Sequence, residues 1–267
     1  MGTISMHTAT TGLEALSTDI DVIANNLANV NTVGFKRART NFEDLLYVSR
    51  GLAGGETNAD GTPPAGTDVG LGVNVSNIQT LFTQGSPIET GQSTDLAIQG
   101  EGFFRVKIFD DVGGGFGYTR AGNFVANRDG DLVLADSDGF RLDPPVTIPV
   151  DATGVTVASD GAVLAVLPGD TEATQVGQIA LYRFPNDTGL EHIGKNLFIT
   201  TAASGQAVEG DPGEGGFGSV LSNFLESSNV TAVRELVDLI KTQRAFELNS
   251  RVITTSDEML QTITHLK

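Results

Sequence analysis

Residues 6–30, MHTATTGLEALSTDIDVIANNLANV, contain apolar side chains that alternate three and four residues apart. This seven-residue repeat lets one helix keep a continuous seam against another. The spacing predicts a helix over residues 3–31, about 43 Å long at 1.5 Å per residue, that pairs with a second helix. The apolar positions of the repeat are Met6, Ala9, Leu13, Leu16, Ile20, Ile23, Leu27 and Val30.

A second stripe of the same period lies near the other end of the chain. Its positions, seven residues apart, are Leu239, Phe246, Ile253 and Leu260. The stripe predicts a helix from Asn229, which would be its N-cap, to about Leu266. Helices of this length are typical of coiled coils. We therefore expect the two terminal helices to pair as a coiled coil and to carry the assembly of the protein.

Between the two stripes, the pattern is typical of antiparallel β-structure. From about residue 70 to residue 200, short apolar or alternating runs, such as residues 146–150, are separated by turn pairs. Asp-Gly occurs at residues 129–130, 138–139 and 160–161, and this dipeptide supplies the positive φ angles of tight hairpins. The predicted fold class is α+β: long N- and C-terminal helices pairing as a coiled coil, with a central antiparallel β domain.

Four segments follow from these patterns. Residues 1–48 hold the N-terminal coiled-coil helix and the start of an inner domain, and residues 49–68 form a Gly- and Pro-rich extension. Residues 69–222 form the central β domain, and residues 223–267 hold the C-terminal coiled-coil helix. An aperiodic stretch as long as the extension is either functional or disordered.

Charge separates the ends of the chain from its middle. The net charge is −17, of which residues 1–47 hold −2 and residues 226–267 hold −1. Near-neutral ends fit helices that pack together, and an acidic middle fits a solvated surface, although acidity also simply favours solubility. Negative charge argues against nucleic acid as a partner. The chain has no run of about 18 apolar residues and no basic leader before an apolar run, so we expect neither membrane insertion nor a cleaved signal peptide.

Motifs for catalysis or for cofactors are weak. The chain has no cysteine, which excludes disulfides, cysteine nucleophiles and thiolate metal sites. Residues 213–218 match the G-x-G-x-x-G pattern, but residues 209–212 before them cannot form a core strand. Residues 136–139 resemble part of a calcium loop that lacks its closing ligands, and hairpin chemistry explains them better. We therefore predict no cofactor, no metal and no catalytic residue.

Polar side chains on the terminal helices form a further set of candidates. They are Asn25, Asn26, Asn29 and Asn31 at the end of the first helix, and Gln243 and Arg244 on the last. A solvated face is one interpretation of this set. The other, which we favour slightly, is that such side chains fix the register among packed helices or between subunits.

Two long segments resemble the terminal signatures of bacterial flagellar rod and hook proteins. Residues 13–37, which end in DVIANNLANVNTVGFKR, are similar to the N-terminal signature of that family. Residues 226–250, ESSNVTAVRELVDLIKTQRAFELNS, are similar to its C-terminal signature. Both segments are long and specific, and they lie at the expected ends of the chain.

Within the family, the chain is most similar to the members that form the distal rod. Residues 41–47, NFEDLLY, followed by the Gly- and Pro-rich extension, resemble a segment specific to those members. Further matches lie at residues 100–104, 118–124 and 186–191. Residues 49–68 agree only in position and composition, which leaves a hook or proximal-rod subunit as the alternative within the family.

The resemblance implies a protein without enzymatic activity. Copies would assemble into a hollow helical tube that crosses the periplasm, transmits motor torque and conducts exported subunits. The implied partners are many copies of the same chain, neighbouring rod and hook subunits, the bushing rings of the outer envelope and the flagellar type III export machinery. The implied location is the basal body of the flagellum. The terminal helices are expected to be disordered before assembly, because an isolated helix cannot bury its stripe.

The resemblance and the periodicity together suggest roles for individual residues. Residues of the two stripes would meet in a helical inner layer: Leu13, Leu16, Ile20, Ile23 and Leu27 with Leu239, Phe246, Ile253 and Leu260. Phe42 and Leu46 resemble the Phe-x-x-x-apolar element with which rod and hook subunits engage the export gate, local packing being the alternative. Residues 49–68 would bridge neighbouring subunits and stiffen the tube.

Two other classes of protein remain open from the residues alone. An extracellular β-rich enzyme acting on polysaccharide or peptidoglycan would need clustered carboxylates in a cleft, and no arrangement in the sequence demands one. A monomeric adhesin or binding module would not need matched terminal helices.

Overall fold

The computed structural model describes residues 2–51, 66–109, 113–169 and 173–265. The chain divides into two compact units, each built from segments that lie far apart in the sequence. The helical unit comprises Met1–Ala28, Ala38–Thr80 and Thr231–Lys267, and the β unit comprises Asn29–Arg37 and Leu81–Val230. This grouping by contact does not test the four sequence segments, which stay predictions. The predicted α+β class, with a helix near each end and a β-rich middle, is confirmed.

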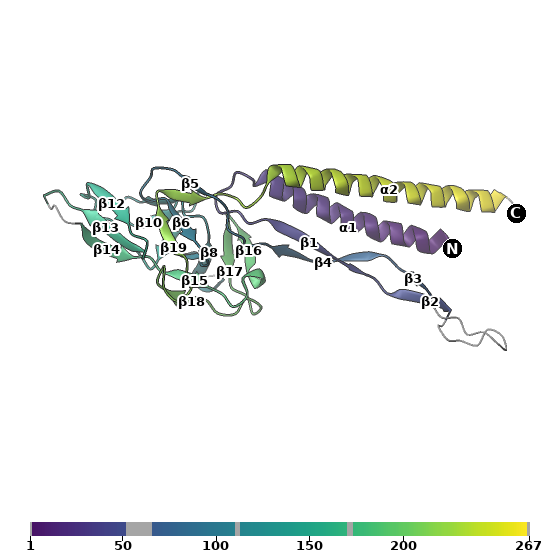
Figure 1. Cartoon of the computed structure of the whole chain (residues 1–267), viewed down its shortest axis with the longest axis horizontal. Coiled ribbons are helices and arrows are strands. Elements are labelled where there is room, and N and C mark those ends of the chain that lie inside the picture. The colour runs from purple at the N-terminus through teal and green to yellow at the C-terminus, as the bar shows by residue number, and fades with distance from the viewer. Residues whose placement is uncertain (1, 52–65, 110–112, 170–172, 266–267) are drawn as a thin grey trace. The chain divides into compact units, whose positions relative to one another are not determined.

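The helical unit contains two long helices and two short antiparallel ribbons. Its helices are α1 (Gly2–Ala28) and α2 (Ala232–His265). One ribbon pairs β1 (Ala38–Asp44) with β4 (Val73–Thr80), and the other pairs β2 (Tyr47–Gly51) with β3 (Thr67–Gly70). The helices lie side by side and run in opposite directions, and β1 and β4 contact α1 (Figure 1).

The β unit is built from antiparallel strands. They are β5 (Pro87–Glu89), β6 (Leu96–Gln99), β7 (Phe104–Lys107), β8 (Phe116–Thr119), β9 (Phe124–Ala126), β10 (Leu132–Leu134), β11 (Arg141–Asp143), β12 (Gly154–Val157), β13 (Ala162–Val166), β14 (Thr174–Gln178), β15 (Leu181–Arg183), β16 (Glu191–Gly194), β17 (Leu197–Ile199), β18 (Val208–Gly210), β19 (Ser219–Ser222) and β20 (Phe224–Glu226). Two short 3₁₀ turns, η1 (Gly113–Gly115) and η2 (Asp187–Gly189), complete the described elements.

One sheet of seven strands organises this unit, in the order β16-β17-β8-β7-β11-β10-β9. A second sheet has the order β12-β13-β14, and β6, β5 and β15 each pair with a strand from later in the chain. Buried side chains form a large hydrophobic cluster, which includes Ile98, Phe104 and Leu142. A smaller aromatic cluster is built around Phe103 and Tyr182.

The three Asp-Gly pairs lie in hairpin connections, as predicted. They join β9 to β10, β10 to β11 and β12 to β13, and their glycines have φ values of 85°, 61° and 83°. These angles lie in the left-handed region, which an L side chain adopts only with strain. The local chemistry of the turns therefore sets the antiparallel topology of the sheet.

The predicted strand at residues 146–150 is wrong. Val146 and Ile148 are buried, but the segment makes only an isolated bridge, between Asp131 and Thr147. Two prolines precede the segment and a third, Pro149, lies inside it, and proline cannot donate a hydrogen bond to a β ladder. The apolar pattern of residues 146–150 therefore indicates burial and not a β-strand.

The C-terminal helix begins at Ala232, so the prediction that Asn229 is its N-cap is also wrong. The Asn229 side chain instead accepts a hydrogen bond from the backbone N–H of Arg37 at 2.7 Å. Its Nδ2 donates to the carbonyl oxygen of Leu81 at 2.8 Å and to that of Thr83 at 3.0 Å. Asn229 therefore ties together three separate segments of the β unit.

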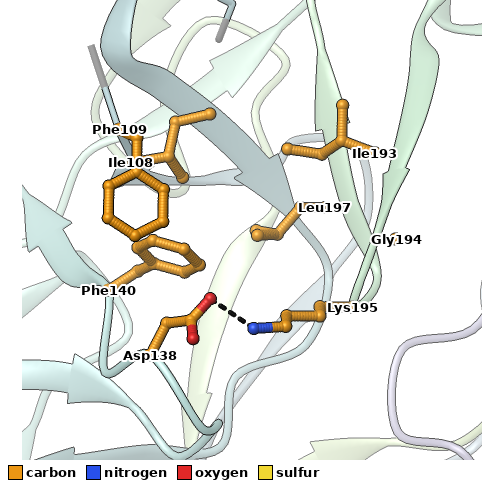
Figure 2. A pocket seen from close by; sticks show the side chains of 8 residues that line it. All are labelled: Ile108, Phe109, Asp138, Phe140, Ile193, Gly194, Lys195 and Leu197. Carbon is orange, nitrogen blue, oxygen red and sulfur yellow. Dashed lines mark hydrogen bonds and ion pairs between the residues drawn. The ribbon is translucent and has the colours of Figure 1, made fainter. Parts of the chain in front are cut away.

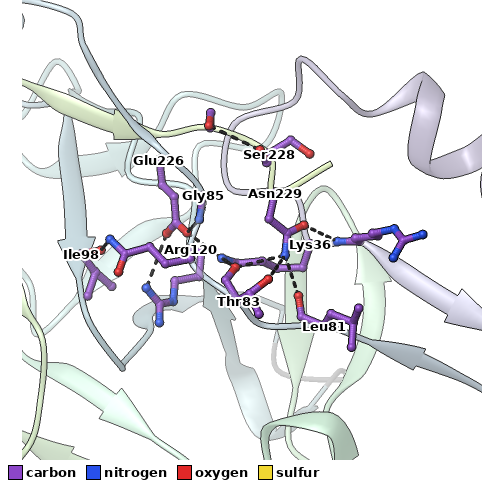
Figure 3. A network of polar contacts seen from close by, with 12 residues as sticks. Lys36, Leu81, Thr83, Gly85, Ile98, Arg120, Glu226, Ser228 and Asn229 are labelled. Atoms are coloured by element: carbon purple, nitrogen blue, oxygen red, sulfur yellow. Dashed lines mark hydrogen bonds and ion pairs between the residues drawn. The ribbon is translucent and has the colours of Figure 1, made fainter. Parts of the chain in front are cut away.

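A buried charged cluster lies beside Asn229 (Figure 3). Glu226 Oε1 accepts hydrogen bonds from Lys36 Nζ at 2.6 Å and from the backbone N–H of Gly85 at 2.8 Å, and Glu226 Oε2 lies 3.5 Å from Arg120 Nη1. The side chains of Lys36, Glu226 and Arg120 are at most 4% exposed. Burial lowers the pKa values of Lys36 and Arg120, and Glu226 opposes both shifts. One carboxylate therefore compensates two buried cations.

We predict that Glu226→Gln lowers the free energy of unfolding of the β unit by about 3 kcal/mol or more, because it leaves two buried cations without a counter-charge. The matched control is Glu101→Gln, which removes the exposed partner of Arg183 and should cost less than about 1 kcal/mol. Urea denaturation followed by circular dichroism measures both. Equal losses for the two variants would contradict this account of the cluster.

Candidate assembly surfaces

The α1–α2 interface contains polar side chains at a seven-residue spacing. Asn26 Nδ2 donates to Glu235 Oε2 at 3.1 Å, and both residues are at most 1% exposed. One heptad away, the hydroxyl of Thr242 lies 3.0 Å from Asp19 Oδ2. Because the helices run in opposite directions, a step of seven residues toward the N-terminus of α1 matches a step of seven toward the C-terminus of α2.

The next heptad step brings Gly12 against Asn249. A Cβ atom at Gly12 would lie 2.9 Å from Asn249 Nδ2, so the end of the Asn249 side chain would have to shift to admit a larger residue. Glycine costs about 1 kcal/mol in a helix relative to alanine, and the close approach explains its presence. We call the pairs Asn26–Glu235, Asp19–Thr242 and Gly12–Asn249 the polar ladder. The same spacing leads to Ser5 and Ser256.

The Asn26 side chain also joins the helix pair to β1. Its Nδ2 donates to the carbonyl oxygen of Ala38 at 2.8 Å, and its Oδ1 accepts from the N–H of Ala38 at 2.9 Å. One amide thus satisfies the backbone of β1 and a carboxyl oxygen of α2. Such fully satisfied buried groups specify one arrangement, since any displacement leaves them without partners.

The predicted apolar stripes lie along the same interface with different degrees of burial. Ile23 is 5% exposed. Phe246 is 37% exposed. The other members of the two stripes are half-buried: Leu13, Leu16, Ile20, Leu27, Leu239, Ile253 and Leu260. The inner-layer role of this set stays a prediction.

The structure separates the predicted polar set. Asn26 belongs to the ladder, whereas Gln243 and Arg244 are exposed, and Arg244 pairs with Glu247 at 2.9 Å on its own helix. Asn25 and Asn31 are exposed, and Asn29 is half-buried.

The sequence interpretation missed Asp19, Glu235 and Thr242. The signal that could have found them is the spacing itself, since Gly12, Asp19 and Asn26 repeat at seven residues beside the apolar stripe.

The opposite side of α2 carries seven large exposed apolar side chains among charged ones such as Lys241, Arg244 and Arg251. We call these seven side chains the outer face of α2, and they are between 44% and 71% exposed: Val233, Leu236, Val237, Ile240, Leu248, Val252 and Met259. At 100° per residue, these positions fall within an arc of about 160° opposite the ladder. Large exposed apolar side chains gathered on one side of a helix make that side a candidate interaction site.

The two residues proposed for export are accessible. Phe42 is 45% exposed on β1, and Leu46, between β1 and β2, is 82% exposed. The extension at residues 49–68 lies mostly outside the described residues, which cover its ends as parts of β2 and β3.

A pocket of about 220 Å³ lies in the β unit (Figure 2). Its lining is Ile108, Phe109, Asp138, Phe140, Ile193, Gly194, Lys195 and Leu197. The one acid of the lining forms an ion pair with its one base, Asp138 with Lys195. Neither a second carboxyl group nor a hydroxyl nucleophile is among these eight residues, so they offer no acid–base pair for hydrolysis.

Neither a metal-binding cluster nor a membrane-spanning helix is present among the described residues. Across the ranges from 2 to 265 that the structure describes, no group of three or more histidine, aspartate and glutamate side chains could hold a metal ion. In the same ranges, neither α1 nor α2 is apolar enough over a sufficient length to span a bilayer.

Three family models match separate parts of the chain. Residues 6–36 match the flagella basal body rod protein, residues 97–165 match the flagellar hook protein FlgE/F/G D1 domain, and residues 221–266 match the flagellar basal body rod FlgEFG protein C-terminal region. The first and third matches include most of α1 and α2, and the second lies in the β unit.

Curated relatives match nearly the whole chain. The flagellar basal-body rod protein FlgG of Caulobacter vibrioides is 45% identical over 98% of this chain and 99% of its own length. The chain belongs to the family of flagellar basal-body rod proteins. A second rod-family relative, FlgG of Bacillus subtilis, is 41% identical over 98% of both chains. The hook protein FlgE of Borreliella burgdorferi is 38% identical over 64% of this chain and 38% of its own length. The resemblance read from the terminal signatures is therefore confirmed.

Proposed function

We propose that this chain is a structural subunit of the distal rod, which assembles with many copies of itself into a hollow helical tube. The tube would transmit motor torque across the periplasm and conduct exported subunits. It would join neighbouring rod and hook subunits and turn inside the bushing rings of the outer envelope. The full-length similarity to rod proteins supports the subunit class.

The outer face of α2 is the observation that carries the assembly proposal. A subunit that stayed alone would leave seven large apolar side chains on one helix face in water. Burying such side chains stabilises a contact by roughly 25 cal/mol per Å² of apolar surface removed from water. Copies that cover this face for one another would therefore gain the free energy that drives polymerisation.

We further propose that α1 and α2 pair as an antiparallel coiled coil. The polar ladder and the apolar stripe that contains Leu239 and Ile253 follow alternate spacings of three and four along α2. This is the heptad pattern of a coiled-coil seam. The pair would form the inner layer of the tube, with Asn26 setting the register.

We predict that Ile240→Lys raises the critical concentration for assembly at least roughly tenfold, because it places a charge in the contact formed by the outer face. The β unit should keep its fold, since Ile240 is 57% exposed and lies on α2. Gln261→Lys, at an exposed site of α2 outside the arc of the outer face, is the matched control and should assemble like the parent chain. Sedimentation and circular dichroism measure both. Equal assembly of Ile240→Lys and the parent would contradict the proposal.

We propose that the extension at residues 49–68 bridges neighbouring subunits and stiffens the tube. Its composition supports an extended segment, and its two ends are held together by the pairing of β2 with β3. The shape of the tube would also distinguish the two assignments within the family: a straight tube would indicate a distal-rod subunit and not a hook subunit.

Deleting residues 52–65 should therefore change the curvature or bending stiffness of assembled filaments and leave the β unit folded. Persistence length from electron micrographs measures the change, and circular dichroism checks the fold. A deletion filament as straight and as stiff as the parent would count against the bridging role.

Export and the absence of catalysis complete the proposal. Phe42 and Leu46 are accessible to a component of the flagellar type III export machinery, and their exposure supports an export-gate contact. Membership of a rod protein family supports a non-enzymatic role at the basal body. The described pocket offers one carboxylate where glycoside hydrolysis uses two, so we propose no enzymatic function.

A further inference from the structure

The pocket in the β unit has apolar walls on two sides. Phe109 and Phe140 form one wall, with their ring centroids 5.6 Å apart, and Ile193 and Leu197 lie across from them (Figure 2). An apolar cavity of about 150 Å³ binds a molecule of the size of benzene. At about 220 Å³, the pocket therefore has room for one branched aliphatic side chain.

Lys195 gives the rim of this pocket a positive charge with spare bonding capacity. Its Nζ donates to Ser137 Oγ at 3.0 Å, forms an ion pair with Asp138 and lies 5.8 Å from the centre of the Phe140 ring. An ammonium group has three N–H donors, and these two bonds use two of them. The third can bind an acid that arrives beside an apolar side chain.

A protruding valine lies elsewhere on the same β unit. Val150 is 81% exposed, in a β-turn closed by a hydrogen bond from the N–H of Ala152 to the carbonyl oxygen of Pro149 at 2.9 Å. We call residues 149–152 the Val150 turn. The N–H groups of Ile148 and Thr153, on its two flanks, bond to backbone carbonyl groups of the β unit. The turn therefore presents Val150 to solvent from a fixed position.

We propose that the Val150 turn of one copy docks in the pocket of a neighbouring copy, with Val150 between the apolar walls and Asp151 bound by Lys195. Asp151 is exposed and follows Val150 directly, so the acid would reach the rim as the valine enters. This inference rests on the proposed function, because it is a contact between assembled subunits. It adds the segments of the β units that meet.

The positions of the two surfaces fit an open assembly. Strand β12 follows the Val150 turn, and β16 contributes to the pocket, and these strands lie at opposite ends of the β unit (Figure 1). A contact between two different surfaces of the same chain is heterologous, and it leaves one of each surface free on every pair. Such contacts extend into helical filaments when the rotation between copies does not close a ring.

Other exposed apolar side chains fit the pocket less well. Three belong to strands of the β unit outside the pocket and are 40–55% exposed: Ile88, Val125 and Val208. Leu46 in the helical unit is 82% exposed, but its sequence neighbours are Leu45 and Tyr47. Val150 combines the greatest exposure among the described large apolar side chains of the β unit with an adjacent acid.

We predict that Val150→Ser raises the critical concentration for assembly roughly tenfold, because the contact loses the buried apolar surface of one valine side chain. Val208→Ser makes the same change at another exposed valine and is the matched control, which should assemble like the parent chain. Sedimentation measures assembly, and circular dichroism checks the fold of both variants. Equal critical concentrations for Val150→Ser and the parent would overturn the inference.

Disulfide cross-linking identifies the occupant of the pocket, since the chain contains no cysteine. A chain with Val150→Cys and Ile193→Cys should form a ladder of covalently linked copies on oxidation, because each copy then contributes a cysteine to each of two neighbours. A chain with Leu46→Cys and Ile193→Cys is the control and should give at least roughly tenfold less linked product.

The outcomes distinguish this contact from the proposed function. A chain that sediments like the parent but forms no Val150–Ile193 ladder would overturn the contact and leave the proposed function standing. More linked product from the Leu46→Cys control would also overturn it, because another segment would then occupy the pocket. A ladder from a chain that never sediments would support the contact and contradict the tube. A chain that neither sediments nor forms a ladder would contradict both.

Discussion

The arrangement of the terminal helices depends on two hydrogen bonds where α1 meets α2, one of them buried and the other part-buried. Asn26 and Glu235 form one such bond and Asp19 and Thr242 another, one heptad apart. Their net contribution to stability is modest, because the same groups are well solvated in the unfolded chain. Asn26 and Glu235 are at most 1% exposed, so a displacement that separates them carries the larger cost of a buried polar group that has lost a partner. Seven large apolar side chains lie exposed on the opposite side of α2.

The β unit meets a different constraint, since its core must hold the two segments that lead to the helices. Lys36 precedes β1 and Glu226 ends β20, and their ion pair joins residues that are 190 positions apart. Asn229 adds bonds from the last segment to the backbone at Arg37, Leu81 and Thr83. The segments before β1 and before α2 are thus fixed within the β unit by polar contacts.

Periodicity predicted the parts of the fold that depend on local pattern. The apolar heptads indicated both helices, and the Asp-Gly pairs indicated three hairpins, because each depends on residues close in sequence. The same reasoning failed at residues 146–150, where prolines limit the pairing to an isolated bridge, and at Asn229, whose partners come from distant segments. A search for apolar periods also overlooks polar residues at that period. Asp19, Thr242 and Glu235 were missed for this reason, although Asn26 was identified as a residue that fixes register.

The terminal signatures indicated the family because they are long and specific. No sequence pattern could indicate that the outer face of α2 stays uncovered in the subunit, since burial depends on where α1 packs.

We expect that assembly of the subunits covers the outer face of α2. Hydroxyl-radical labelling with mass spectrometry, applied to free and sedimented chains, tests it most directly at Leu248 and Met259. We predict that both side chains are strongly labelled in the free chain and protected in the assembly. Equal labelling in the two states would contradict the account.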